Sequence, residues 1–337
     1  MMSYNEAITT FEHVFSRCRD ESCMQDHMND DSIRILLEKL YKRGETAEEI
    51  AAAAMVMREH SIKLPVPEAL EDKLMDNCGT GGDKSGSFNI STTVSILLAA
   101  SGAHVAKHGN RSITSKSGSA DVLEAMGINL HLTPEQQVTM LQECGFAFIF
   151  AQNHHPAMKY LMPIRKSLDH RTIFNILGPL TNPASVRKQL IGVFDKSFIM
   201  PIAKALELNN AQRGMVVSSA DGMDEIGIST VSFAASLDTG AIKEFEIDPE
   251  AYGIKLAPQE SIKGGTAIDN AAIMEEILAG NVHGPKKDVV LLNAAAALWV
   301  DGQARDIQDG LEIANAVIDS GDAARQLKTI AHVSCQF

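Results

Sequence analysis

The sequence predicts an α/β protein in which a small α-helical domain precedes a large domain built on a central, mostly parallel sheet. In the first part of the chain, apolar residues repeat at helical spacing and no run alternates as a strand would. Farther along, short apolar runs alternate with helical stretches, which is typical of a parallel sheet covered by helices on both faces. The proline-containing segment 63–67 separates the two patterns. We therefore expect a helical domain over residues 1–65 and an α/β domain over residues 70–337.

The helices of the first domain are marked by periodicity and by a cap. One helix is indicated by apolar residues at helical spacing: Ile33, Leu36, Leu37 and Leu40. Thr46 followed by Glu49 forms a capping box, which opens a second helix through residues 50–57. The prolines at positions 65 and 67 then interrupt regular structure.

The second domain is expected to alternate strands and helices. Short apolar runs predict strands at residues 105–106, 146–151, 189–194 and 215–217. Helical stretches fall between them, at residues 92–101, 120–126 and 199–206. Another helix begins with a cap, a first-position proline and a capping-box glutamine: Thr133, Pro134 and Gln136. Residues 231–247 alternate as a hairpin that turns at Thr239-Gly240. The last third returns to helix, at residues 267–278, 289–300 and 307–318.

Composition and charge exclude several classes of protein. The chain of 337 residues is 45% hydrophobic and 22% charged, as globular proteins are. No apolar run approaches the roughly 18–20 residues that cross a bilayer, and the N-terminus lacks the layout of a signal peptide, so we expect a cytoplasmic protein without membrane partners. The net charge of −13 argues against nucleic-acid binding, which needs basic surface. Five cysteines without a C-x-x-C pair indicate reduced, mostly structural thiols.

The densest glycine cluster, Gly-Thr-Gly-Gly-Asp at residues 79–83, stands before a helix that Ser91 or Thr92 could cap. Glycines let backbone N–H groups approach an anion closely, and the N-terminus of a helix adds its dipole. Neither of the two common nucleotide-binding glycine patterns is met. The cluster therefore predicts a phosphate-binding loop of another kind, and the alternative is a plain tight turn.

Two charged clusters follow expected strands. Residues 107–112 (Lys-His-Gly-Asn-Arg-Ser) come after the run at 105–106, and small hydroxyl residues continue to position 119. Such donors at the carboxyl end of a strand suit an anionic or polar ligand, while the alternative is a solvated basic loop. Asp221, Asp224 and Glu225 follow the run at 215–217. Adjacent carboxylates suit Mg²⁺, which substrate phosphates would complete, and the alternative is an acidic surface turn.

Further along the chain, two histidines are candidate metal ligands and an arginine is a candidate ligand for a substrate carboxylate. His154 and His155 are sequence neighbours, and neighbouring residues of a helix do not converge on one ion, so we expect no metal there. Arg165 has the charge and the shape to hold a substrate carboxylate through two hydrogen bonds. The alternative for an arginine on a helix is simple solvation.

Together these motifs resemble the anthranilate phosphoribosyltransferase family. The resemblance spans residues 3–330 and rests on blocks that occur in the family's order, at residues 79–83, 88–92, 105–111, 117–121, 155–158, 171–175, 177–183 and 221–225. The chain departs from the usual pattern at Lys84-Ser85 and at residues 227–229, which concerns loop geometry and removes no binding group. The resemblance implies a fold of the nucleoside phosphorylase and class III phosphoribosyltransferase type, a homodimer, and a small domain that also takes helices from about residues 160–185.

The resemblance also implies a reaction. The amine of anthranilate would displace pyrophosphate from phosphoribosyl pyrophosphate (PRPP) with Mg²⁺ present, giving N-(5-phosphoribosyl)anthranilate in the second step of tryptophan biosynthesis from chorismate. The leaving group is highly anionic, so the task is mainly charge neutralisation and positioning. By analogy with other glycosyl transfers, the transition state should resemble an oxocarbenium ion. The aromatic amine is uncharged at neutral pH, so no general base is required before attack.

Carried over position by position, the resemblance implies three groups of site residues. PRPP would be bound by Gly79, Gly82, Asp83, Ser87, Asn89, Ile90, Ser91, Thr92, Lys107, His108, Gly109, Asn110, Arg111, Ser112, Ser115 and Ser119. Anthranilate would contact Gly79, Asn110 and Arg165, and Mg²⁺ would be held by Ser91, Asp224 and Glu225. No residue is assigned as catalytic. Lys107 and His108 lie nearest to that role, and we expect His108 to be a packing or hydrogen-bonding histidine.

The sequence leaves two other functions open. A pyrimidine nucleoside phosphorylase resembles this family in fold and in the Lys-His-Gly stretch, but it generally has glycine where this chain has Asn110 and lacks the acidic pair at 224–225. A non-catalytic paralogue that binds nucleic acid would need a basic stripe and could lose the anthranilate residues, whereas this chain is acidic and keeps Asn110 and Arg165.

Overall fold

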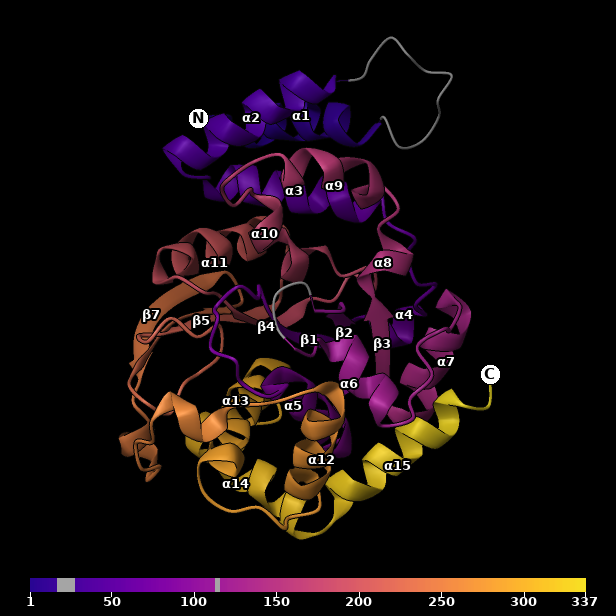
Figure 1. Cartoon of the computed structure of the whole chain (residues 1–337), viewed down its shortest axis with the longest axis vertical. Helices are drawn as coiled ribbons and strands as arrows, with labels where there is room; N and C mark the ends of the chain where they lie inside the picture. The colour runs from indigo at the N-terminus through magenta and orange to yellow at the C-terminus, as the bar shows by residue number, and fades with distance from the viewer. Residues whose placement is uncertain (17–27, 113–115) are drawn as a thin grey trace.

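The computed structural model describes residues 1–16, 28–112 and 116–337. Over these residues a single sheet separates two layers of helix, and a further helical layer covers one end of the molecule (Figure 1). Ser115, an expected PRPP ligand, lies outside the described residues, as do Cys18 and Cys23. Among the described helices, none combines the length and the apolar character needed to cross a membrane.

The sheet has seven strands in the order β3-β2-β1-β4-β5-β6-β7 within the described part of the chain. Their bounds are β1 Leu74–Gly79, β2 His104–Gly109, β3 Phe146–Phe150, β4 Lys188–Gly192, β5 Arg213–Ser219, β6 Ser232–Asp238 and β7 Ala241–Ile247. The first five strands are parallel, and β6 and β7 are antiparallel to their neighbours. The chain runs outward from β1 to β3 and then returns to β4 on the other side of β1. This reversal makes the carboxyl ends of β1 and β4 the place where an open α/β sheet binds ligands.

Helices surround the sheet on both faces. The N-terminal layer, at the top of Figure 1, holds α1 (Tyr4–Ser16), α2 (Asp30–Arg43), α3 (Ala47–Glu59) and α9 (Met158–Lys166). Between this layer and the sheet lie α8 (Ala151–His154), α10 (Phe174–Leu177), the 3-10 turn η1 (Gly178–Thr181) and α11 (Ile199–Leu208). The opposite face is covered mainly by α5 (Ile90–Ala100) and α13 (Pro285–Asp301), with α12 (Ala267–Leu278), α14 (Ile307–Asp319) and α15 (Asp322–Ser334) outside them. The remaining helices are α4 (Glu68–Glu71), α6 (Ser119–Ala125) and α7 (Pro134–Cys144).

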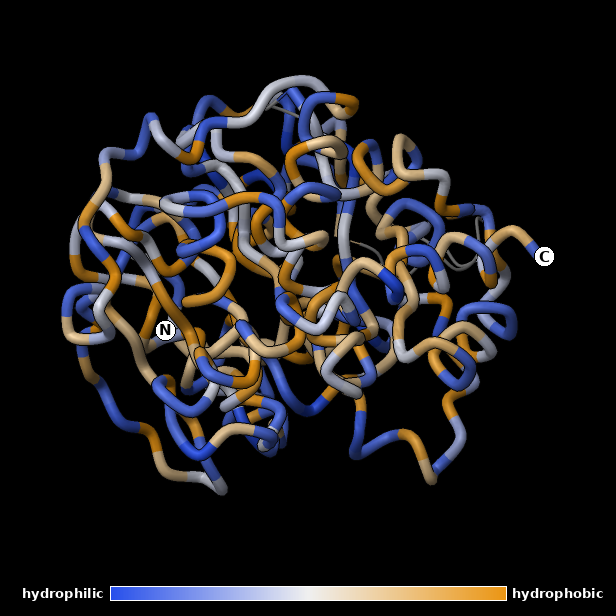
Figure 2. Tube along the Cα trace, turned by 90° about the horizontal axis from the view of Figure 1, so that it is seen from below, coloured by the Kyte–Doolittle hydropathy of each residue, from blue (hydrophilic) through white to orange (hydrophobic). Residues whose placement is uncertain are grey.

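The apolar core forms two clusters, one on each side of the sheet. One joins β1–β3 to α5, α13 and the C-terminal helices, and the other joins α1–α3 and α9 to α11 and the near face of β4–β6. The second cluster includes buried apolar residues between positions 157 and 180, which pack with the N-terminal helices. Figure 2 shows the hydrophobic segments concentrated inside the trace and hydrophilic stretches along its periphery. The division into domains at residues 65–70 stays a prediction.

Several elements follow from local sequence signals. The capping boxes at Thr46 and Thr133 both form, and they open α3 and α7. The hairpin turn between β6 and β7 consists of Thr239 and Gly240, both at positive φ, which is the backbone of a tight two-residue hairpin. One expectation was wrong: α5 begins at Ile90 after Asn89, and neither Ser91 nor Thr92 caps it. The physical reason is that Ser91 already lies within the first turn, where its side chain serves other partners.

Candidate active site

The glycine loop follows β1 directly and is held by the acidic segment that follows β5. The backbone N–H of Gly81 donates to Asp224 Oδ2 at 2.6 Å. A Cβ on Gly79 would collide with the Asp224 carboxylate, and one on Gly192, at the end of β4, would collide with the Asp224 backbone. Gly81 and Gly82 have φ values of 71° and 84°, as the expected glycine loop requires. Glycine is therefore needed for close approach at Gly79 and for backbone conformation at Gly81 and Gly82.

Asp224 and Glu225 lie beside this loop with Asp83 close by, and no ion pair joins these carboxylates to a cation within the described residues. Burial raises the pKa of Asp224 well above its usual value, and the negative charges of Asp83 and Glu225 raise it further. Burial likewise raises the pKa of Glu225 to about 7, against the lowering effects of Lys107 and of hydrogen bonds from Ser91. The hydroxyl and the backbone N–H of Ser91 both contact Glu225. Oxygen donors that repel one another in this way fit a hard divalent cation.

Lys107 provides the positive charge at the floor of the site. It is 1% exposed, and its ammonium donates to the Asn77 carbonyl at 2.8 Å and to Ser91 Oγ at 3.4 Å. Burial lowers its pKa, while the charges of Asp76 and Glu225 oppose this shift. Lys107 therefore connects the strand β2 to the same Ser91 that contacts Glu225.

A polar wall stands beside these charges. The Asn89 side chain donates to the Ser117 carbonyl at 3.3 Å and accepts from Asn270 at 2.8 Å. Ser119 Oγ donates to the Asn110 carbonyl at 3.1 Å, and a Cβ on Gly109 would collide with Ser119 Oγ. These contacts bring the segments 107–112 and 117–119 together with the start of α5.

The structure places other expected PRPP ligands differently. Arg111 forms hydrogen-bonded ion pairs with Glu124, at 2.6 and 2.7 Å, and with Asp121 at 2.8 Å. The backbone N–H of Ser112 also donates to Asp121. Ile90 and Thr92 are each 1% exposed, backbone included, and the Ser87 hydroxyl lies 3.2 Å from that of Ser85. The contacts of these three residues with PRPP stay predictions.

Arg165 is on α9, a helix of the layer at the top of Figure 1. Its guanidinium packs over the ring of Phe174, 5.6 Å from the centroid, and donates to Met162 Sδ at 3.7 Å. Among the described residues no carboxylate forms an ion pair with it, and burial lowers its pKa. A half-buried guanidinium without an acidic partner suits a carboxylate ligand.

A histidine pair unforeseen from the sequence is formed by His108, the residue after Lys107 on β2, and His155. His108 is 6% exposed, and its Nδ1 lies 2.9 Å from the Gly178 carbonyl. Its Nε2 lies 3.2 Å from Nε2 of His155. Burial lowers the pKa of His108 to about 4, so it is a neutral, hydrogen-bonding histidine, as expected. His154 faces the Ile62 carbonyl instead, at 2.6 Å, so the two neighbouring histidines serve different partners.

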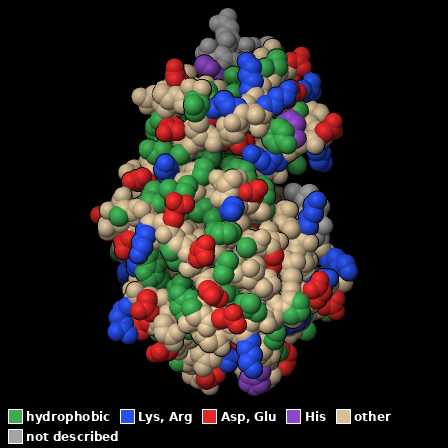
Figure 3. Space-filling view, turned by 90° about the vertical axis from the view of Figure 1, so that its left-hand side faces the viewer, with side chains coloured by type: hydrophobic (Ala, Val, Ile, Leu, Met, Phe, Trp, Pro, Cys, Tyr) green, Lys and Arg blue, Asp and Glu red, His purple; other side chains and the backbone are tan. Residues whose placement is uncertain are grey.

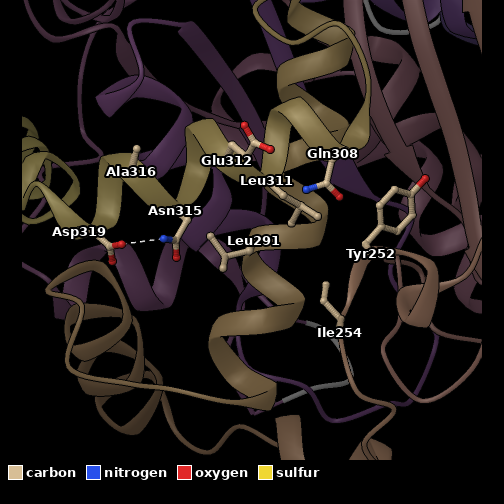
Figure 4. Close-up of a pocket in the computed structure, with 9 residues that line it drawn as sticks. All are labelled: Tyr252, Ile254, Leu291, Gln308, Leu311, Glu312, Asn315, Ala316 and Asp319. Carbon is tan, nitrogen blue, oxygen red and sulfur yellow. Dashed lines mark hydrogen bonds between the residues drawn. The ribbon is translucent and has the colours of Figure 1, made fainter.

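A cavity of about 480 Å³ lies away from this cluster, between α13, α14 and the segment around residue 252. Figure 4 shows its apolar side chains facing a polar rim. The lining residues are Tyr252, Ile254, Leu291, Gln308, Leu311, Glu312, Asn315, Ala316 and Asp319. The charged members are acidic, so this cavity does not suit a phosphate-bearing ligand, and the glycine loop remains the candidate site.

Comparison with known proteins agrees with the geometry. Residues 71–324 match the family described as "Glycosyl transferase family, a/b domain". An anthranilate phosphoribosyltransferase of Xanthobacter autotrophicus is 47% identical over 299 residues, which cover 89% of this chain and 86% of the relative. The crystal structure of anthranilate phosphoribosyltransferase from Thermus thermophilus superposes with a TM-score of 0.90 at 37% identity, covering 99% of this chain and 96% of that one. The Saccharomyces cerevisiae enzyme in complex with PRPP and Mg superposes with a TM-score of 0.84 at 26% identity, covering 99% and 93%.

Proposed function

The chain belongs to the anthranilate phosphoribosyltransferase family, and we propose that the cluster around residues 79–83 is where it joins its two substrates. It transfers the phosphoribosyl group of PRPP to the amine of anthranilate, giving N-(5-phosphoribosyl)anthranilate and pyrophosphate in the second step of tryptophan biosynthesis. The observation that carries the assignment of the site is the contact between the glycine loop and Asp224, because it joins an anion-binding backbone to oxygen ligands for a cation.

Mg²⁺ is assigned to Ser91, Asp224 and Glu225. The donor set fits this ion, because the carboxylates repel one another where they are and Ser91 adds a neutral oxygen. In the described part of the chain, no three His, Cys, Asp or Glu side chains could hold a metal ion on their own. Substrate oxygens would complete the coordination. When bound, Mg²⁺ neutralises charge on the pyrophosphate group as it leaves.

The protein's own groups bind and orient PRPP. The backbone of residues 79–83 offers N–H groups to anionic oxygens, and the Lys107 ammonium supplies a fixed positive charge that needs no rearrangement during the reaction. The further PRPP contacts proposed are those of Ser87, Asn89, Ile90, Ser91, Thr92, Gly109, Asn110, Arg111, Ser112 and Ser119, with Ser115 among them although it lies outside the described residues.

Arg165 is proposed to hold the carboxylate of anthranilate, with Gly79 and Asn110 also in contact. This role is supported because no carboxylate of the described residues forms an ion pair with the Arg165 guanidinium. The amine of anthranilate is neutral, so the attack on the anomeric carbon needs orientation rather than a base. His108 does not act as a base in this proposal, because its Nδ1 faces the Gly178 carbonyl and its Nε2 faces His155.

The remaining assignments are a homodimer, which the family resemblance implies, and a cytoplasmic location, which was expected from the sequence. The phosphorylase alternative is disfavoured by Asn110 and by the carboxylates at 224–225. The nucleic-acid alternative is disfavoured by the net charge of −13 and by the face in Figure 3, where acidic and basic side chains are interspersed.

The fluorescence of anthranilate itself tests the function. We expect the signal to decay when the protein meets PRPP and Mg²⁺ together, and to persist when either is left out. Phosphorolysis of a pyrimidine nucleoside in place of that decay would establish the phosphorylase alternative. If the protein shows neither activity, the non-catalytic paralogue is the alternative that remains.

A further inference from the structure

A fully buried carboxylate lies under the candidate site and has no role in the reaction described above. Asp76 is on β1, three residues before the glycine loop, and it is 0% exposed. A charge in such a place is costly unless it is paired and hydrogen-bonded. Burial raises the pKa of Asp76 to about 6, against the lowering effects of the Lys107 ammonium and of its hydrogen bonds.

Asp76 is surrounded by donors. Its Oδ1 accepts the backbone N–H of His108 at 3.2 Å, and its Oδ2 accepts the side-chain amide of Asn182 at 2.9 Å. The Cys78 thiol approaches Oδ2 at 3.5 Å. An ionised carboxylate only accepts, whereas an asparagine would present an NH₂ group to one of these donors. The position therefore calls for a carboxylate and not merely for a polar side chain.

The donors belong to segments that carry the site. His108 directly follows Lys107 on β2. Asn182 directly follows η1, and its amide also donates to the Ala106 carbonyl on β2 at 2.8 Å. The first residue of η1, Gly178, faces the His108 ring through its carbonyl. One carboxylate thus closes a ring of contacts that runs from β1 to β2, from β2 to η1 and back to β1.

We propose that Asp76 is a positioning residue that holds the backbone around Lys107 and His108 against β1, so that the Lys107 ammonium keeps its place between the Asn77 carbonyl and Ser91. Asp76 acts through these groups and does not touch the substrate. The inference rests on the proposed function, since correct positioning is measured through PRPP.

Asp76→Asn tests the proposal, because it keeps the size of the side chain and turns one acceptor into a donor. We expect the PRPP KM to rise about tenfold, the anthranilate KM to change far less, and amide hydrogen exchange over residues 104–110 to accelerate. The matched control is Gln189→Leu. Gln189 is the buried polar neighbour of Asp76 in β4, and it donates to the Pro179 carbonyl at 2.6 Å without touching His108 or Lys107. We expect this control to lower the melting temperature and leave the PRPP KM unchanged.

An unchanged PRPP KM and unchanged exchange in a folded Asp76→Asn protein would overturn the proposal, as would an equal rise of KM in the Gln189→Leu control. If Asp76→Asn does not fold, Asn182→Ala removes the other half of the network while Asp76 stays, and an unchanged PRPP KM in that variant is equally decisive. A wild-type protein that leaves anthranilate untouched would contradict the proposed function instead. The exchange measurement still tests the role of Asp76 in that case, because it needs no activity.

Discussion

Two carboxylate pairs flank the candidate site, and they are in opposite electrostatic states. Asp121 and Glu124, on α6, meet the Arg111 guanidinium. Hydrogen bonds from Arg111 lower the pKa of Glu124, and those from Gly118 and Arg111 outweigh burial to lower the pKa of Asp121. Asp224 and Glu225, in the loop after β5, have raised pKa values because burial and mutual repulsion exceed what Lys107 and Ser91 offset. The first pair has its cation on the same chain, and the second pair is where we propose that a cation from outside is held.

The largest effect is expected from neutralising the second pair. Asp224→Asn combined with Glu225→Gln should reduce turnover by about a hundredfold or more, since it removes the ligands that position charge-neutralising Mg²⁺. The fold should persist, because the change removes two charges that repel each other. Steady-state rates over a Mg²⁺ titration measure the loss, and thermal melting is the control for folding. Wild-type turnover at limiting Mg²⁺ would contradict the metal assignment.

The same contrast, between a charged group with and one without a partner on the chain, distinguishes two arginines. Arg165→Ala should raise the anthranilate KM by about tenfold to a hundredfold and the PRPP KM far less, because a charge-assisted hydrogen bond contributes about 1.5–3 kcal/mol. Arg171 is the matched control, since it forms a two-point ion pair with the buried Glu45 at 2.8 and 2.9 Å. Arg171→Ala should lower the melting temperature through the unpaired Glu45, while the ratio of the two KM values stays constant.

Equal increases of both KM values in Arg165→Ala would show instead that Arg165 is structural. A selective rise of the anthranilate KM in Arg171→Ala would move the carboxylate site to that arginine.

The glycine loop offers a test at a single Cβ. In Gly82→Ala the new methyl group enters open space but sits on a backbone with φ of 84°, which strains a residue other than glycine. We expect PRPP affinity to fall by about tenfold and anthranilate affinity to change less. Calorimetry with PRPP gives the affinity, and thermal melting reports the cost to the fold. Normal PRPP binding by a normally folded variant would make residues 79–83 a plain turn.

The smallest effect is on stability, and its sign differs between the two carboxylate pairs. The raised pKa values of Asp224 and Glu225 mean that the folded protein without metal binds more protons than the unfolded chain above the ordinary carboxyl pKa, and for Glu225 this window extends to about pH 7. Their contribution to stability therefore falls as pH rises through this window. The melting temperature of the Asp224→Asn, Glu225→Gln variant minus that of the wild type should increase from pH 5 to pH 8. A decrease of this difference over the same range would contradict the raised pKa values.

Glu124→Gln should behave in the opposite way. The pKa of Glu124 is lowered in the folded state, so its contribution is present above the ordinary carboxyl pKa and is lost as pH falls through the folded value. Because this ion pair is about one-third exposed, the loss at neutral pH should be at most about 1 kcal/mol. Chemical unfolding at pH 7 and at pH 3 measures the difference in stability between Glu124→Gln and the wild type, which should be smaller at the lower pH.

Much of the fold could be predicted from local signals. The capping boxes at Thr46 and Thr133 and the turn at Thr239-Gly240 depend on residues three or fewer positions apart, and each formed as expected. The central strand β1 was not predicted, because only Leu74 and Met75 are apolar before Asp76 and Asn77. These two polar side chains are buried, and their partners come from residues 14 to 106 positions away. Hydrophobic periodicity cannot reveal a strand whose buried polar residues form hydrogen bonds with residues so far away in the sequence.

The sequence by itself determined the kinds of chemical group in the candidate site: a glycine loop, and a basic stretch and an acidic pair that each follow a predicted strand. Only the tertiary structure decided which charges meet. It paired Arg111 with Glu124 and left Asp224 and Glu225 without a full counter-charge, and it brought His155 to His108 across 47 residues. The physical reason is that residue type sets what a group can bind, while its free energy of ionisation depends on burial and on neighbours that only folding supplies.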